Sequence, residues 1–484
     1  MSNKYINELR AAAIERSAAI SRRAFLGGGV GAMGLFTMLG QSALASALGE
    51  GPEPYMIGKA SAKHMILVFI NGGMSHLDLF EDKPLLNERF GEELPPSILV
   101  NRGVLDATKS RGAFPVVGTK YKFSSYGESG MRFSELVPKI GAQADRMTVL
   151  RSVQVDHVLH EAAISQLLTG APLDGRPSWG SWMSYALGSM NENIPEFVAL
   201  VSNARGTSPA QPRLWGNGFL PGRFAGTKFR SGKSAVLDVK TPEGMNSESR
   251  LEMLKALEKL NGIESDRAGD PDVQTRIKAY EMAARMQTSV PEMTDLSTET
   301  PEMLEMYGAE ADKGSFASNC IQARRLVEGG ARFVQLIDGG WDMHSNLPQM
   351  LPRKARDIDQ AIGALIEDLD QRGLLDETLV VVASEFGRTP HCQGAFSRES
   401  YGRDHHPLAS VVLMAGGGTK RGFTFGESDD WGWDVTKDPV HMHDVQATAL
   451  HCMGINHERL TYRHQGRDFR LTDVGGNVVH DVLA

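Results

Sequence analysis

The stretch RDIDQAIGALIEDLDQRGLLDETLVVVASEFG, residues 356–387, decides the fold of this 484-residue chain. Its first part repeats apolar residues every three or four positions, which predicts one long amphipathic helix over residues 353–371, ended by Gly373. Its second part contains a continuous apolar run at residues 378–383, typical of a strand buried on both faces of a parallel sheet. A helix that leads directly into such a strand indicates an α/β fold.

Other apolar runs predict the remaining elements of the sheet. The predicted strands cover residues 64–70, 146–151, 197–201, 333–337 and 411–414. The predicted helices cover residues 162–168, 247–262, 273–288 and 443–453. Strands alternating with helices indicate a doubly wound, mostly parallel sheet with helices on both faces. Segments rich in glycine, proline and polar residues are interpreted as surface insertions near residues 84–130 and 202–315.

The N-terminus is interpreted as an export signal. Ser21-Arg22-Arg23-Ala24-Phe25-Leu26 resembles the twin-arginine motif, and an uncharged apolar run follows it. We therefore expect passage through the twin-arginine translocase and a periplasmic or otherwise extracytoplasmic location. No later apolar stretch approaches the length of a membrane span, so none is expected after cleavage. The predicted organisation is a signal peptide at residues 1–47, a linker at 48–62 and a single α/β domain at 63–484.

The net charge and the cysteine content argue against two classes of protein, namely those that bind nucleic acid and those that rely on disulfide bonds. With 51 Lys and Arg against 59 Asp and Glu, the net charge is -8, which argues against nucleic acid as a partner. The three cysteines, Cys320, Cys392 and Cys452, are far apart in the sequence. An exported protein with so few cysteines does not rely on a disulfide framework.

Three polar clusters follow or lie close to predicted strands. They are GGWDMH at residues 339–344, SEFGRTP at 384–390 and GRDHHP at 402–407. Because an open α/β sheet builds its site at strand ends, these clusters predict a metal or anion pocket. The predicted metal ligands are Asn71, Asp342, His344, Glu385 and His405, and the predicted anion-binding residues are Arg388 and Arg403. Further pocket candidates are His76, Asp78, His157 and His443.

The region around the opening stretch resembles the C-terminal core of sulfatases, in which a helix runs into "T-L-V-V-V-x-S-D-H-G". Leu167-Leu168-Thr169-Gly170 is similar to the "L-L-T-G" that closes the nucleophile helix of those enzymes. The whole pattern resembles a family of twin-arginine-exported, sulfatase-like proteins described as a domain of unknown function. The resemblance covers roughly residues 60–170 and 320–465, and it implies an alkaline phosphatase/sulfatase-like core.

The departures from the sulfatase pattern fall at three positions. Asn71 stands where these enzymes place a metal-binding Asp, and Phe386 replaces a second ligand after Glu385. Ten residues before Gly170, where sulfatases carry the covalent nucleophile, this chain has His160. A histidine cannot become formylglycine, so His160 is expected to act as a base toward water or as a nucleophile.

Two functions of different classes follow. The first is a metal-dependent hydrolase of a small anionic phosphate or sulfate ester, in which a divalent ion (Ca, Mg or Zn) polarises the ester and His160 is the catalytic residue. The second is a catalytically inactive sulfatase-like module that binds a metal or a partner. The substitutions at positions 71, 160 and 386 favour the second, and the retained clusters of His, Asp and Arg favour the first.

Overall fold

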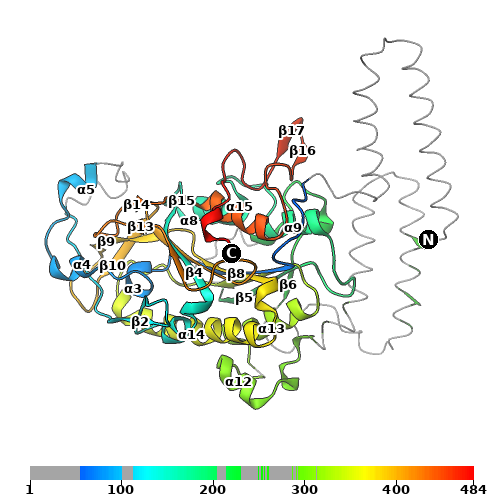
Figure 1. The fold of residues 1–484 in the computed structure, drawn as a ribbon, viewed down its shortest axis with the longest axis horizontal. Coiled ribbons are helices and arrows are strands. Elements are labelled where there is room, and N and C mark those ends of the chain that lie inside the picture. The colour runs from blue at the N-terminus through cyan, green and yellow to red at the C-terminus, as the bar shows by residue number, and fades with distance from the viewer. Residues whose placement is uncertain are drawn as a thin grey trace, which may run out of the picture. The chain divides into compact units, whose positions relative to one another are not determined.

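The computed structural model describes residues 55–100, 113–203, 214–229 and 293–484 except 312, with isolated positions between 249 and 290. The predicted signal peptide lies outside these residues, as do nearly all of the helices expected at 247–262 and 273–288. The chain from Ile57 to Ala484 forms one unit by its internal contacts. Figure 1 shows its elements in chain order.

A nine-stranded mixed sheet forms the centre of this unit, in the order β12-β4-β11-β8-β1-β7-β5-β6, with β15 also paired to β4. Its strands are β1 (His64–Ile70), β4 (Met147–Gln154), β5 (Phe197–Asn203), β6 (Thr227–Phe229), β7 (Phe333–Asp338), β8 (Thr378–Ala383), β11 (Ser410–Ala415), β12 (Phe423–Phe425) and β15 (Val440–His441). Strand β11 runs antiparallel to both of its neighbours, β4 and β8, and every other pair is parallel. The predicted mostly parallel α/β fold is therefore confirmed.

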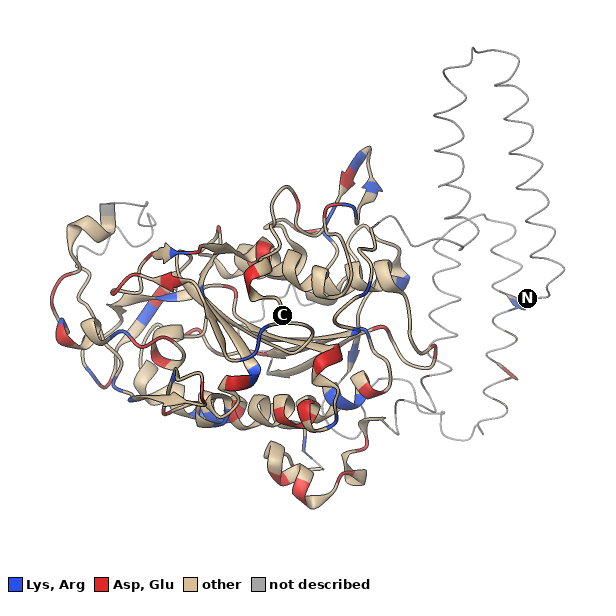
Figure 2. Ribbon diagram, in the orientation of Figure 1, with Lys and Arg blue, Asp and Glu red and all other residues tan. Residues whose placement is uncertain are grey.

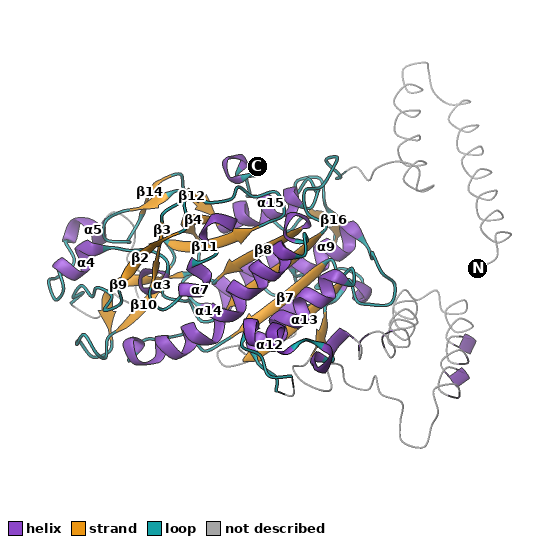
Figure 3. Ribbon diagram, turned by 60° about the horizontal axis from the view of Figure 1, so that its bottom comes forward, coloured by secondary structure: helices purple, strands orange, loops and turns teal. Residues whose placement is uncertain are grey.

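Helices cover both faces of the sheet (Figures 1 and 3). One face carries α7 (Pro138–Gly141), α12 (Pro301–Tyr307), α13 (Phe316–Glu328) and α14 (Leu347–Gln371). The other carries α8 (His160–Thr169), α9 (Trp179–Leu187) and α15 (Met442–Cys452). Among the described residues, none of the helices is long and apolar enough to span a membrane. Figure 2 shows charged residues of both signs spread over the described chain, which fits the small net charge.

Helix α14 confirms the prediction made from its apolar stripe, whose members Ile358, Ile362 and Leu365 are fully buried. It begins earlier than predicted, at Leu347, with a proline in its first turn. A proline is tolerated there because the first backbone N–H groups of a helix have no intrahelical acceptor. Gly373, at φ +69°, follows the helix as predicted.

The strands β7, β1 and β8 lie side by side and end level with one another. Ile70 on β1 pairs with Asp338 on β7, and Phe69 pairs with Ala383 on β8. The loops after these strands therefore meet at one edge of the sheet. Gly72, at φ +122°, permits this meeting, because a Cβ there would lie 2.7 Å from the backbone nitrogen of Asp342.

Smaller elements surround this edge. They are α3 (His76–Leu79), α4 (Pro84–Glu88), α5 (Pro96–Val100), the hairpin of β2 (Phe123–Tyr126) with β3 (Met131–Ser134), and the hairpin of β9 (Gly387–Gln393) with β10 (Gly402–His406). The segment predicted as an irregular insertion near 84–130 thus contains short helices and one strand of a hairpin. The hairpins β13 (Glu427–Ser428) with β14 (Val435–Lys437) and β16 (Tyr462–His464) with β17 (Arg467–Phe469) lie nearer the C-terminus.

Candidate metal centre

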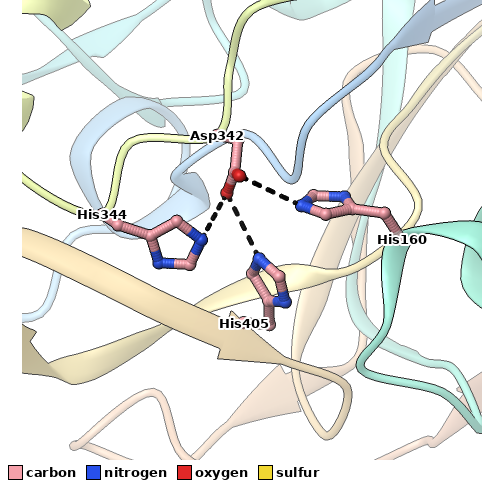
Figure 4. Close-up of side chains that lie close together, drawn as sticks. All are labelled: His160, Asp342, His344 and His405. Carbon is pink, nitrogen blue, oxygen red and sulfur yellow. Dashed lines mark hydrogen bonds and ion pairs between the residues drawn. The ribbon is translucent and has the colours of Figure 1, made fainter. Parts of the chain in front are cut away.

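Four side chains from three parts of the chain converge at this sheet edge (Figure 4). Asp342 and His344 lie in the loop after β7, two residues apart. His405 lies on β10, and His160 is the first residue of α8. One ligand atom from each of the four lies within 4.8 Å of the ligand atoms of the others. The structure therefore brings together three of the predicted metal ligands with the predicted catalytic histidine.

Asp342 contacts all three histidines of the group. Its Oδ1 lies 2.7 Å from Nε2 of His344 and 3.2 Å from Nε2 of His405, and its Oδ2 lies 3.3 Å from Nε2 of His160. Ligand atoms around a tetrahedral zinc ion with bonds of ~2.0–2.1 Å are separated by roughly 3.3 Å. The spacing of the three imidazoles around Asp342 is thus close to that of a metal site.

Each of the three imidazoles presents the same nitrogen to Asp342 because its other nitrogen is already bonded. Nδ1 of His405 lies 2.7 Å from the carbonyl oxygen of Val158, and Nδ1 of His160 lies 2.7 Å from a carboxylate oxygen of Glu385. Nδ1 of His344 bonds the side-chain oxygen of Gln393. Metal-binding histidines are held by bonds of this kind to the nitrogen that does not bind the metal.

The two ring nitrogens of His405 have different hydrogen-bond partners. A carbonyl oxygen only accepts, so Nδ1 of His405 carries the proton that it donates to Val158. Burial lowers the pKa of His405, although its hydrogen bond with Asp342 acts in the opposite direction. Nε2 of His405 lies 3.2 Å from a carboxylate oxygen of Asp342. This contact is stable when a cation, either a proton on Nε2 or a metal ion, lies between the two atoms.

The proton is one cation that fits the group. Burial alone would lower the pKa of His160, but its hydrogen bonds and charge interactions with Asp342 and Glu385 outweigh this and raise it to about 9. Burial would likewise raise the pKa of Asp342, yet hydrogen bonds from His160, His344 and His405, with the charge of Arg388, hold it far below its usual range. The centre therefore attracts positive charge strongly.

The donor set also fits a metal ion. Three imidazole nitrogens with one carboxylate suit zinc and similar transition metals, whereas calcium and magnesium prefer oxygen ligands. The side chains of Asp342 and His344 are 37% and 34% exposed, so the centre is open to solvent on one side. Zinc that keeps a coordination position open to solvent is typical of catalytic rather than structural sites.

Glu385 and Asn71 do not join the group of four ligands. Glu385 is fully buried, where it accepts hydrogen bonds from the Gly72 backbone N–H (2.9 Å) and the Ser384 hydroxyl (3.0 Å) in addition to contacting His160. Glu385 therefore bonds Nδ1 of His160, the ring nitrogen that does not face Asp342. Asn71 is also fully buried, and its side-chain nitrogen and oxygen have no hydrogen-bond partner within the described parts of the chain. Its predicted role as a ligand stays a prediction.

The predicted anion-binding arginines are both buried and bonded internally. Arg388 donates to Asp342 (2.6 Å) and to the carbonyl oxygens of Gly72, Gly73 and Arg403. Arg403 bonds Asp78 (2.7 Å) and the carbonyl oxygens of Val117 and Thr389. Their side chains are 1% and 0% exposed. In the structure both arginines bond partners within the protein, and their predicted role in binding an anion stays a prediction.

The remaining pocket candidates lie outside the centre. His76 and Asp78 are fully buried on α3, where Nδ1 of His76 accepts from the Arg388 backbone N–H. His443 bonds the carbonyl oxygen of Gly170, beyond the far end of the ten-residue α8, roughly 15 Å from its start. His157 precedes α8 and is not among the four converging residues.

Sequence reasoning missed the residues that orient the imidazoles. Gln393 contacts His344 only because β9 passes beside the loop after β7. Val158 acts through its backbone carbonyl, which any residue would supply. Neither contact leaves a signal in the sequence. His160 was singled out by its position in the helix, but as a catalytic residue and not as a ligand.

A comparison with models of protein families shows to which family this chain belongs. Residues 62–483 match the family described as "Protein of unknown function (DUF1501)". The chain belongs to the DUF1501 family. This covers nearly all of the predicted 63–484 domain. No curated protein matches this DUF1501 chain significantly.

Solved structures show a distant likeness to this DUF1501 protein. A protein in the alkaline phosphatase superfamily from Vibrio parahaemolyticus is 8% identical, with 84% of this chain and 70% of that chain covered and a TM-score of 0.36. The PsFucS1 sulfatase from Pseudoalteromonas sp. is 11% identical, with 83% and 69% covered and a TM-score of 0.34. A mutant TAB5 alkaline phosphatase with bound Mg is 12% identical, with 82% and 99% covered and a TM-score of 0.32. TM-scores this low do not equate individual positions of the centre with positions in those proteins.

Proposed function

We propose that this protein is a metal-dependent ester hydrolase with one divalent ion bound by His160, Asp342, His344 and His405. The observation that carries the proposal is the convergence of one ligand atom from each of these four residues within 4.8 Å of the others. The nitrogen-rich donor set favours zinc over the calcium or magnesium that the sequence also allowed. An ion bound here would polarise the ester and lower the pKa of a water molecule.

His160 is the ligand best placed to exchange protons with a reacting group. It contacts Oδ2 of Asp342, whereas His344 and His405 share Oδ1. Its Nδ1 bonds the buried Glu385, and this carboxylate fixes the ring and favours its protonated form. We propose that Nε2 of His160 would leave the ion to take the proton of the attacking water, and that Asp342, His344 and His405 would retain the ion.

Replacing His160 tests this assignment. In His160→Ala we expect metal-dependent hydrolysis to fall at least about 100-fold, the lower range for loss of a general base. The protein should stay folded and keep bound zinc through the other three ligands. Zinc content by mass spectrometry, circular dichroism and a screen of phosphate and sulfate esters measure these quantities. His480→Ala, at an exposed histidine far along the chain, is the matched control.

The inactive-module alternative gives a different result in the same experiment. In that case the wild-type protein retains zinc, yet neither it nor His160→Ala hydrolyses any ester in the screen. If wild type hydrolyses an ester and His160→Ala is equally active, His160 is only a ligand or a structural residue. Both results contradict the proposal.

We also propose that the protein is exported by the twin-arginine pathway. The support is the Arg22-Arg23 motif with the apolar run behind it. Changing both arginines to lysine should leave the full-length precursor in the cytoplasm, as seen by fractionation and immunoblotting. Normal processing and periplasmic recovery of the double variant would contradict export by this route.

A further inference from the structure

A hollow outside the candidate metal centre lies beside the edge strand β12 and its neighbour β4. It has a volume of about 510 Å³, and Arg151, Lys420, Phe423 and Phe425 are among the residues that line it. Strands β4, β11 and β8 separate β12 from β1 in the sheet. With neighbouring strands ~4.8 Å apart, β12 lies roughly 19 Å from β1, whose following loop meets the candidate metal centre. The hollow is therefore a separate part of the molecule.

Arg151 brings a positive charge to this hollow and has no partner within the protein. It lies on β4 and is partly buried. Its Nε is enclosed without a hydrogen-bond partner, and its guanidinium group forms no hydrogen bond or ion pair with any of the described residues. Native structures rarely leave such donors without an acceptor, because burial removes their hydrogen bonds to water. Since Nε is enclosed, an acceptor from outside the chain can reach only the terminal nitrogens, Nη1 and Nη2.

Lys420 supplies a second cation, and its neighbours hold it in place. Its backbone N–H donates to the carbonyl oxygen of Val482 (2.8 Å), and its backbone carbonyl accepts from the hydroxyl of Thr148 (2.5 Å). Its ammonium group donates to the carbonyl oxygen of Asp481 (2.7 Å) and lies 4.8 Å from the ring centroid of Phe423. In the part of the chain that the structure describes, no carboxylate pairs with this ammonium group. The group is thus positioned before a ligand binds and keeps donors for a further acceptor.

The other charged residues of the hollow do not neutralise these two cations. Lys437 pairs with Glu427 at 3.3 Å, so their opposite charges offset each other. Asp438 and Asp481 also line the hollow, but both are exposed, and neither forms an ion pair with the two cations. Exposed carboxylates remain hydrated and interact weakly with charges that they do not contact. Their presence nevertheless favours a ligand with one anionic group over a polyanion.

We propose that this hollow binds the oxyanion group of a small ligand, a phosphate or a carboxylate, through Arg151 and Lys420. A planar guanidinium group offers parallel N–H donors that match two oxygens of such a group. Phe423 and Phe425 line the same hollow, with their ring centroids 6.4 Å apart. These rings provide an apolar surface for a non-polar group attached to the oxyanion. The site is independent of the metal-dependent hydrolysis proposed above.

Binding of three anions to the metal-free protein tests this site. Inorganic phosphate, phenyl phosphate and benzoate would be compared by isothermal titration calorimetry in a buffer that contains no other oxyanion. Binding of the phosphate probes alone identifies a phosphate ligand, and binding of benzoate alone identifies a carboxylate ligand. We expect phenyl phosphate to bind at least about threefold more tightly than inorganic phosphate, because its ring is buried against the phenylalanines. No binding of any probe would overturn the inference, and tighter binding of inorganic phosphate would overturn the role of the two rings.

Replacing Arg151 locates the bound anion. Arg151→Gln should weaken binding at least about tenfold, because it removes a charge and its hydrogen-bond donors. The matched control is Arg421→Gln, which removes the same charge from an arginine that pairs with Asp370 and Asp376 and does not line this hollow. The control should bind the anions as wild type does. Equal weakening in both variants would show only a long-range attraction to positive charge and would overturn the site.

Thermal unfolding gives a second measurement that does not depend on calorimetry. A ligand that binds the folded chain raises the unfolding temperature, so the bound probe should raise it for wild type and Arg421→Gln but much less for Arg151→Gln. Asp342→Asn separates the hollow from the candidate metal centre, and this variant should bind the anion as wild type does. Loss of anion binding in Asp342→Asn with normal binding in Arg151→Gln would place the anion at the metal centre and overturn the inference.

Discussion

Two carboxylate clusters lie at the same end of the sheet and are built from the same kinds of residue. Asp78 is fully buried and accepts hydrogen bonds from Arg403 (2.7 Å), Tyr401 (2.8 Å) and Ser75 (2.5 Å). Asp342 is 37% exposed and meets an arginine and three imidazole nitrogens. The partners named for Asp78 are all hydrogen-bond donors, whereas His405 presents to Asp342 a ring nitrogen that can bind either a proton or a metal ion.

This difference separates a structural cluster from a functional one. Burial alone would raise the pKa of Asp78, but the charge and hydrogen bonds of Arg403 outweigh it and lower the pKa. The Asp78 cluster is thus complete without any further ion. The imidazoles of the Asp342 cluster can instead hold either protons or a metal ion. The hydrogen-bonding roles of the partners therefore distinguish the candidate metal centre at Asp342 from the cluster at Asp78. The residue types alone do not distinguish the two.

The largest expected effect is the loss of metal binding when the Asp342 cluster is broken. Asp342→Asn keeps an oxygen that accepts from Arg388 but removes the charge that all three imidazoles share. We expect zinc to be no longer retained after dialysis, while circular dichroism stays unchanged because the side chain is partly exposed. Full zinc retention by this variant would place the metal elsewhere.

The same substitution in the Asp78 cluster should act on stability. Asp78→Asn leaves Arg403 charged, buried and without a counter-ion, which costs about 3–5 kcal/mol of unfolding free energy. Urea unfolding of the metal-free proteins measures this difference. A loss below about 1 kcal/mol, the scale of an exposed ion pair, would show that Asp78 does not stabilise the fold as described.

We expect a smaller effect on zinc binding from a change at Glu385, because this residue bonds His160 and is not one of the four proposed ligands. Glu385→Gln preserves its shape but weakens its support of His160, and we expect zinc affinity to fall about 10- to 100-fold. Competition with a chelating dye measures the change. If zinc binding is lost as completely as in Asp342→Asn, Glu385 is itself a ligand, as the sequence predicted.

The smallest effect is the release of one proton when zinc binds. The pKa of His160 is raised from 6.5 to about 9, so its proton stabilises the metal-free protein fully below pH 6.5. That stabilisation is lost as the pH rises through about 9. Zinc must displace this proton, so its apparent affinity should rise about tenfold per pH unit between these limits.

Calorimetry at pH 7.5 in buffers of different ionisation enthalpy measures the released proton. His160→Gln should release fewer protons than wild type, by about one. Equal release by the two proteins would show that His160 is already neutral before zinc binds.

The sequence predicted those features that depend on neighbours along the chain. The apolar stripe of α14 and the run of β8 identified the fold, and the order of strands and polar clusters located Asp342 and His344. The burial of Arg388 and Arg403 has no signal in the sequence, because it depends on how the β9–β10 hairpin packs. The direction of the Glu385 side chain, toward the Gly72 backbone, is likewise set by contacts between distant segments. The residue types indicate which metal ligands the chain offers. Only the packing of distant segments shows which ring nitrogens and carboxylate oxygens are left to bind an ion.

We propose that His160, Asp342, His344 and His405 bind one ion. X-ray absorption spectroscopy of the stoichiometrically zinc-loaded protein tests this set of ligands most directly. We expect three nitrogen ligands and one or two oxygen ligands at ~2.0–2.2 Å. Failure to retain one zinc per chain, or a shell with sulfur or with oxygen alone, would contradict it.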